Sequence, residues 1–182
     1  KYSFEGIHIK ICVSDEIFPY LTDQFVTNPA KFVKKPLFMH WRPKDLIRLI
    51  SWRYFKYLNK HDYINEEEST IDWDDYKDIY TKIWLRFFPE YIINRRNIEE
   101  KTLPYILRHT QLRPRQLVTI CNAIAEQSRD KGIFPNFDED SIKTGVYNSE
   151  FALATDLLSS YSSIYDNISD ILGALAGEPI EF

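Results

Sequence analysis

The feature that most limits what this chain can fold into is a helical repeat of apolar residues that begins at Pro43. Apolar side chains recur three or four residues apart, as on one face of an α-helix, at Leu46, Ile50, Tyr54 and Tyr57. The repeat is clearest between Pro114 and Gly132, where a proline suits the first helical turn and a glycine suits the cap at the end. We therefore predict a mainly α fold in which residues 42–182 form a helical bundle.

Further helices are expected along the same stretch. The patterns predict them over 72–88, around 98–109 with an interruption near Pro104, over 138–142 with Asp138 as the cap, over 149–158 and over 168–175. Residues 59–69 are polar and include three successive glutamates, so they are predicted to form a solvated loop.

The first 41 residues follow a different pattern. Residues 7–13 alternate between apolar and other residues, which is the period of a strand, and residues 37–41 are a second short candidate. Short helices are predicted over 16–22 and 29–34. Because one or two strands cannot make a stable sheet alone, they either pair with each other or belong to a sheet whose other strands lie elsewhere. The predicted division is 1–41 as the end of an α/β core and 42–182 as the helical bundle.

Composition excludes several classes of protein. A chain with 44% hydrophobic and 15% aromatic residues is not intrinsically disordered, and a net charge of −4 argues against whole-surface affinity for nucleic acid. No run of eighteen apolar residues and no signal-peptide pattern occurs, so we predict no membrane partner and a cytoplasmic location. Cys12 and Cys121 lack metal or redox spacing and are predicted to be buried free thiols. Because the chain starts at Lys1 and its only methionine is Met39, we expect it to belong to a longer protein.

The sequence contains no complete catalytic site. None of its five glycines stands in a phosphate-binding loop, its four histidines have no paired metal spacing, and no serine lies in a nucleophile elbow. The acidic clusters at 66–68 and 72–75 are better explained as a solvated loop and a helix start than as a metal site.

A calcium-loop pattern is also incomplete. Asn136, Asp138 and Asp140 imitate its beginning, but Ser141 replaces the required glycine and Tyr147 stands where the bidentate glutamate belongs. Capping of a helix by Asp138 is the better explanation.

The strongest candidate for binding chemistry is a pair of arginines at a helix start. Arg113 and Arg115 flank Pro114, although the N-terminus of a helix already carries partial positive charge. Cations gathered there can receive an anion together with free backbone N–H groups. The alternative is ordinary surface charge, or a salt bridge to one of the many acidic residues.

The same helix start carries the most specific motif in the chain, His109-Thr110-Gln111-Leu112-Arg113-Pro114-Arg115-Gln116-Leu117 followed by Ile120-Cys121-Asn122. It resembles a motif in a family of bacterial P-loop ATPases related to the KAP and STAND groups, often found in phage-defence and conflict loci. Earlier, Ile9 to Phe18 resembles the family's strand after the Walker B acid. The stretch Leu37 to Trp41, followed by Leu46, Ile47 and Arg53, resembles its last core strand and first lid helix. The chain departs from the family at Ser14-Asp15-Glu16, where the family usually has Arg-Ser-Asp.

The resemblance implies that this chain is the late ATPase core and helical lid of a nucleoside-triphosphate switch. The phosphate-binding loop and the metal-binding acid would lie upstream of Lys1, so ATP and Mg²⁺ are implied only for the longer protein and no cofactor is expected in this chain. Arg115 matches the arginine that senses nucleotide phosphates at the start of a lid helix, with Arg113 as its neighbour. The implied partners are the rest of the ATPase core, and a protein effector or a second copy.

Two other functions remain open from the sequence. A helical protein-interaction module without catalytic activity is suggested by aromatic residues that crowd one helix, namely Trp52, Tyr54, Phe55 and Tyr57. Nucleic-acid binding is suggested less strongly by the basic pairs Lys34/Lys35, Arg95/Arg96 and Arg113/Arg115.

Overall fold

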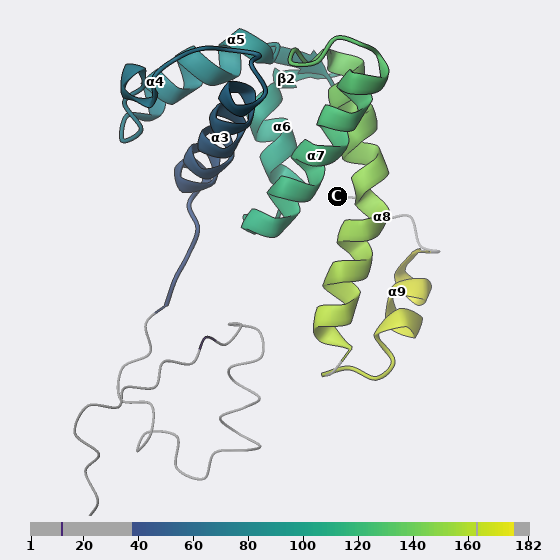
Figure 1. The fold of residues 1–182 in the computed structure, drawn as a ribbon. Coiled ribbons are helices and arrows are strands. Elements are labelled where there is room, and N and C mark those ends of the chain that lie inside the picture. The colour runs from purple at the N-terminus through teal and green to yellow at the C-terminus, as the bar shows by residue number, and fades with distance from the viewer. Residues whose placement is uncertain (1–11, 13–37, 163, 177–182) are drawn as a thin grey trace, which may run out of the picture. The chain divides into compact units, whose positions relative to one another are not determined.

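A computed structural model describes residue 12 and residues 38–162 and 164–176, and it is mainly helical, as predicted (Figure 1). In chain order the elements are α3 (Pro43–Lys60), the 3₁₀ turn η1 (Glu68–Thr70), α4 (Tyr76–Ile79), the π-helical segment η2 (Tyr80–Trp84), α5 (Leu85–Phe87), β1 (Tyr91–Ile93), β2 (Glu99–Lys101), α6 (Thr102–Arg108), α7 (Pro114–Asp130), α8 (Glu139–Tyr161) and α9 (Ile168–Ala176). The chain divides into two units. One is His40–Tyr161, and the other combines Lys1–Met39 with Ser162–Phe182.

The two helices with the clearest sequence signals begin as predicted, and α7 also ends as predicted. Helix α3 continues to Lys60, so residues 59 and 60, predicted to lie in a loop, are helical. Both α3 and α7 have proline at the first helical position, where its missing N–H leaves no hydrogen bond unmade. Gly132 follows α7 with a φ of 70°, and its N–H donates to the carbonyl of Arg129 at 2.9 Å. Asp138 caps α8 because its Oδ1 accepts from the N–H of Ser141 at 2.7 Å.

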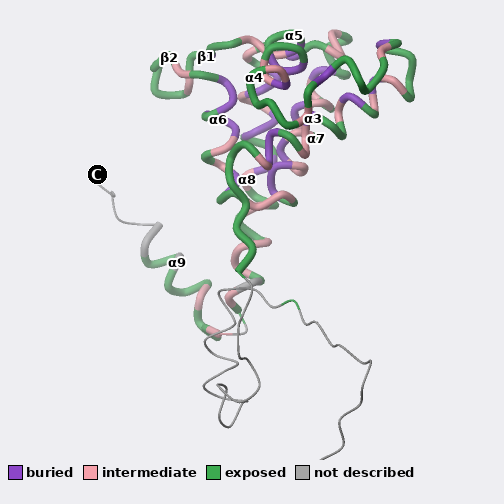
Figure 2. Tube along the Cα trace, turned by 90° about the vertical axis from the view of Figure 1, so that its left-hand side faces the viewer, coloured by how far each residue is buried: buried purple, intermediate pink, exposed green. Residues whose placement is uncertain are grey.

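The core of the larger unit lies where α3, η2, α6, α7 and the first half of α8 meet (Figure 2). Its fully buried side chains are mostly branched aliphatic residues and include Leu46, Leu58, Ile79, Ile106, Leu117, Ile120, Ile124, Ile142 and Val146. Burying one such side chain contributes about 1.5–3 kcal/mol, so this cluster dominates the stability of the unit. On α3 the buried face also includes Ser51 and Phe55, whereas Tyr54 from the predicted stripe is only partly buried.

Among the described elements of the larger unit, the most extensive contact is between α7 and α8. Gly145 on α8 lies directly against the α7 backbone at Ile124. This contact explains an error in the sequence-based prediction, which placed two helices at 138–142 and 149–158. They are one continuous helix, because a glycine that would weaken an isolated helix here allows α8 to approach α7.

The predicted strand at 37–41 is not observed over residues 38–41, which form neither a strand nor a helix. The sheet of the described chain is instead a hairpin, in which Tyr91 pairs with Lys101 and Ile93 with Glu99 in antiparallel register. Residues 98–101, predicted to be helical, therefore belong to this hairpin and the helix starts at Thr102. Pro104 lies in its first turn, where it interrupts nothing.

The helix predicted over 72–88 begins later, at Tyr76, because Asp75 caps it by accepting from the N–H of Lys77 at 2.9 Å. Its middle is the π-helical segment η2. The strand predicted over 7–13 (apart from Cys12), the helices predicted over 16–22 and 29–34, and the proposed core segment 1–41 up to residue 37 lie outside the described residues. Cys12 itself is exposed, so the prediction that both thiols are buried is wrong for that residue.

Candidate functional site

The two predicted arginines lie at the start of α7. Arg113 is the N-cap residue, with a φ of −97° and a ψ of 126°, and its side chain makes no capping hydrogen bond. Arg115 is in the first turn, its side chain is 84% exposed, and its Nη1 lies 3.4 Å from a carboxylate oxygen of Asp156 on α8. The first turn holds no acidic residue. Positive charge from two guanidinium groups thus adds to the positive end of the helix dipole.

The loop that leads into this helix has an unusual backbone. Gln111 and Leu112 have φ values of 45° and 54°, which side chains other than glycine rarely adopt. Thr110, which is fully buried, holds the loop in place. Its hydroxyl donates to the carbonyl of Leu107 at 2.6 Å and accepts from the N–H of Leu112 at 3.2 Å, and its carbonyl accepts from the N–H of Arg113 at 2.8 Å. Thr110 therefore holds the loop that places Arg113 and Arg115 at the start of α7.

One buried and one partly buried polar side chain flank this loop. Gln116 occupies the position from which a capping-box side chain would reach back to the helix start, yet its Oε1 has no hydrogen-bond partner among the residues that the structure describes. The Nε2 atom of His109 is buried and also lacks a hydrogen-bond partner within the described part of the chain. Burial, followed by the nearby charge of Arg108, lowers the pKa of His109, so this imidazole is neutral at pH 7 and adds no positive charge to the site.

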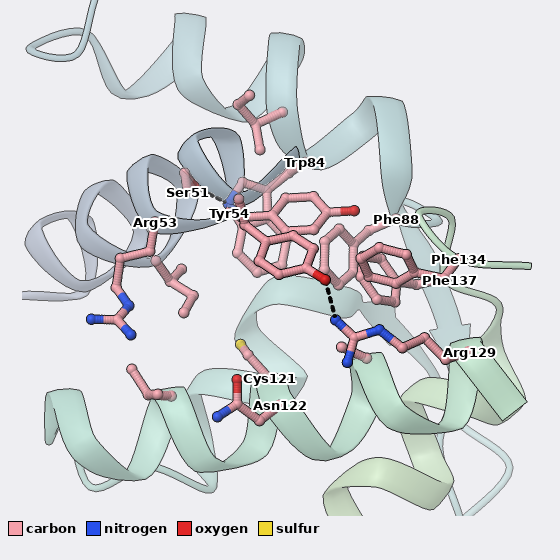
Figure 3. Close-up of a pocket in the computed structure, with 15 residues that line it drawn as sticks. Ser51, Arg53, Tyr54, Trp84, Phe88, Cys121, Asn122, Arg129, Phe134 and Phe137 are labelled. Atoms are coloured by element: carbon pink, nitrogen blue, oxygen red, sulfur yellow. Dashed lines mark hydrogen bonds between the residues drawn. The ribbon is translucent and has the colours of Figure 1, made fainter. Parts of the chain in front are cut away.

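A second feature of the larger unit is a cavity of about 180 Å³ between α3, η2 and α7 (Figure 3). Its walls are mainly aromatic and aliphatic and include Ile50, Tyr54, Tyr57, Ile83, Trp84, Phe88, Val118, Ala125, Phe134 and Phe137. Arg53 reaches from α3 toward α7, and the amide of Asn122 lies on the α7 side (Figure 3). Within the described part of the chain, neither side chain has a hydrogen bond or an ion pair.

Hydrogen bonds fix the aromatic walls of this cavity. The indole N–H of Trp84 donates to Ser51 Oγ at 2.8 Å, and the hydroxyl of Tyr54 donates to the carbonyl of Pro135 at 2.5 Å. Burial raises the pKa of Tyr54 far above its usual value, so this hydroxyl keeps its proton. At the far end, Arg129 donates to the hydroxyl of Tyr57 at 3.0 Å. The cavity is therefore suited to holding an apolar group, not to proton transfer.

Burial makes the thiol of Cys121, in the cavity wall, a poor nucleophile. Although part of Cys121 is accessible, its burial raises the pKa of the thiol to about 12, which leaves almost no thiolate at pH 7. Among the residues that the structure describes, no group of three His, Cys, Asp or Glu side chains is arranged to hold a metal ion. No helix in that part of the chain is long and apolar enough to cross a membrane.

The residues that the sequence analysis singled out lie at two separate sites in the structure. Arg113 and Arg115 do not line the cavity, whereas Arg53 and Asn122, both quoted in the motif comparison, meet there. Sequence reasoning missed the contribution of Arg129 and of the segment 134–137. The available signal was the run Phe134-Pro135-Asn136-Phe137, two residues after Gly132.

The chain matches no protein-family model, no curated protein and no solved structure with which it was compared.

Proposed function

We propose that this chain is the sensor and lid portion of a cytoplasmic P-loop nucleoside-triphosphatase switch, in which Arg115 and Arg113 sense the nucleotide phosphates. The observation that carries the proposal is the start of α7, where the side chain of Arg115 is 84% exposed and the N-cap residue makes no side-chain capping hydrogen bond. The motif resemblance described above supports the same assignment. Without the phosphate-binding loop of the longer protein, the chain would hydrolyse nothing by itself.

The chemistry of the arginine pair suits this role. A guanidinium group offers a planar fork of N–H donors that matches phosphate oxygens, and it keeps its charge at all physiological pH values. Arg115 is paired with Asp156, but an exposed ion pair contributes only about 0–1 kcal/mol. A phosphate group can therefore take the place of Asp156 at little cost. ATP and Mg²⁺ belong to the longer protein in this proposal.

The test is to compare nucleotide hydrolysis by the complete protein with hydrolysis by a variant that lacks Arg115 and by a control variant. Arg115→Ala should reduce turnover by ten-fold or more, because the lost contact stabilises charge in the transition state. Arg96→Ala, at an exposed arginine in the β1–β2 hairpin, is the matched control and should retain parental turnover. Equal turnover in the two variants, with both folded as judged by circular dichroism, would refute the sensor role.

A second candidate function is a helical protein-interaction module without catalysis. It is favoured by the large aromatic side chains that α3 and the loop before it leave exposed, Trp41 and Trp52 among them. The gene sequence upstream of Lys1 distinguishes the two candidate functions. A glycine-rich loop ending in Gly-Lys-Ser or Gly-Lys-Thr, followed by an acidic strand end, would support the ATPase, and its absence would favour the interaction module.

A further inference from the structure

Three of the chain's four tryptophans meet at one groove of the larger unit. The groove has a volume of about 540 Å³ and runs over the first half of α3 and the segment around η1. Its lining consists of Trp41, Asp45, Arg48, Leu49, Trp52, Glu68 and Trp73. Trp41 and Trp52 are 45% and 42% exposed, which is a large apolar area to leave in water.

Hydrogen bonds to Glu68 hold two of the indole rings in fixed orientations. The indole N–H of Trp52 donates to the carboxylate of Glu68 at 2.8 Å, and that of Trp73 donates to its carbonyl at 3.2 Å. The ring of Trp73 also packs edge-on against Phe55, with centroids 5.6 Å apart. Because these rings are already ordered, a ligand that binds against them loses little side-chain entropy.

Acidic residues outnumber basic ones around the groove, although Asp45, which lines it, is ion-paired with Arg42 at 2.8 Å. Asp45 and Glu68 line it, and the segment from Glu66 to Asp78 contains seven carboxylates and one lysine. The arginine in the lining, Arg48, is ion-paired with Asp74 at 2.7 Å. A negative potential over an aromatic surface favours a cation that can lie over an indole ring.

The chain itself provides an example of this recognition. The ammonium group of Lys56 lies 5.6 Å from the ring centroid of Trp52 and is ion-paired with Glu68. A lysine thus already satisfies both requirements of the site, an aromatic face and a carboxylate. Trp41, by contrast, has no hydrogen bond, ion pair or cation over its ring among the described residues.

We propose that this groove binds a basic segment of a partner protein, with a lysine or arginine of that segment over Trp41 and an adjacent apolar side chain between the tryptophans. This interaction goes beyond nucleotide sensing and does not depend on it. Single-stranded nucleic acid also stacks on tryptophan, but its phosphates would face the carboxylates of this groove. An acidic peptide would meet the same repulsion. A basic peptide is the ligand that fits both the rings and the charge.

The experiment is a selection from a phage-displayed library of random nine-residue peptides on the immobilised 182-residue chain. The parent chain should enrich peptides in which lysine or arginine neighbours an apolar residue. Trp52→Ala and Asp45→Lys should each fail to retain them, and Phe151→Ala, at an exposed aromatic on α8, should retain them. Enriched peptides without an excess of basic residues would overturn the proposal. Retention by Trp52→Ala and Asp45→Lys at the level of the parent chain would also overturn it.

One enriched peptide, synthesised and titrated by calorimetry, gives the quantitative test. Each folded groove variant should weaken its affinity at least ten-fold, and raising NaCl from 50 to 500 mM should weaken binding to the parent, because charge contributes to it. Asp45→Lys alters the charge without removing a ring, so it remains informative if Trp52→Ala unfolds. Sedimentation of the chain without peptide measures whether the chain self-associates. Self-association that Trp52→Ala abolishes would assign the groove to a second copy of the chain and refute the basic-peptide proposal.

Discussion

The close approach of α7 and α8 at Gly145 makes a sharp prediction about stability. A Cβ atom added at this position would lie 2.6 Å from the Cα and N atoms of Ile124 and 2.7 Å from its Cγ1. Two of the three are backbone atoms, which no side-chain rotation can move away. Gly145→Ala therefore forces the two helices apart, although alanine is the better helix former.

The size of the effect follows from two opposing contributions. Because the Cβ is about 0.8 Å short of ordinary contact, the helices must separate by a similar amount, and a gap of 0.5–1 Å loses about a quarter to a half of each dispersion contact across the interface. Such overpacking costs about 1–3 kcal/mol, and backbone contacts place this case at the upper end. Replacing a mid-helix glycine by alanine stabilises the helix by about 1 kcal/mol, which offsets part of this cost. We expect a net loss of about 2 kcal/mol in the free energy of unfolding.

Urea unfolding followed by circular dichroism measures this loss, and two variants separate its causes. Asn148→Ala, at an exposed position three residues further along α8, gains helix propensity without the clash and should be neutral or slightly stabilising. Gly132→Ala has free space around its Cβ but a φ of 70°, so it should lose about 1–2 kcal/mol through backbone strain alone. If Gly145→Ala is as stable as the parent while Gly132→Ala is destabilised, α7 and α8 do not pack as described.

Two further predictions concern buried and capping hydrogen bonds. Thr110→Val keeps the shape of the side chain but leaves the N–H of Leu112 without a partner, so urea unfolding should show a loss of about 1–3 kcal/mol. Asp138→Ala removes the α8 cap and should cost about 1 kcal/mol at pH 7. Burial opposes ionisation of Asp138, but hydrogen bonds from Ser141 and Lys131 hold its pKa below the usual value. Because the folded-state pKa is lowered, the stabilisation is present above the unfolded-state pKa and is lost as pH falls through the folded-state pKa. The difference in urea midpoint between parent and variant should therefore shrink as the pH is lowered from 7 into that acidic range.

The parts of the fold that follow local rules were predictable from the sequence. The start and end of α7 depend on Pro114 and Gly132, whose backbone preferences act within one turn. The cap at Asp138 is equally local. The continuity of α8 was not predictable in this way, because Gly145 is favoured there only by the backbone of Ile124, twenty-one residues earlier in the chain. The β1–β2 hairpin was missed because strands of three residues are too short to show an alternating pattern.

In the candidate site, too, only the features that follow local rules were predictable from the sequence. The placement of Arg113 and Arg115 at an exposed helix start follows from the proline between them, so the sequence alone predicts it. The cavity joins residues far apart in the chain, as the hydrogen bond from Tyr54 to Pro135 across 81 positions illustrates. No spacing rule connects such residues. The tryptophan groove has the same character, since its rings come from three separate stretches of sequence.

The packing at Gly145 also bears on the proposed sensor. Arg115 and Asp156 bridge α7 and α8 with an exposed ion pair of small energy, whereas Ile124 and Gly145 bring the same two helices into backbone contact. The ion pair can therefore open while the helix pair stays closed. An anion that recruits Arg115 would exchange one partner for another without disturbing the core, and any larger movement would carry α7 and α8 together. If α7 and α8 form a lid, as proposed, they are expected to move as a rigid pair, while the proposed sensor Arg115 changes partners at one end.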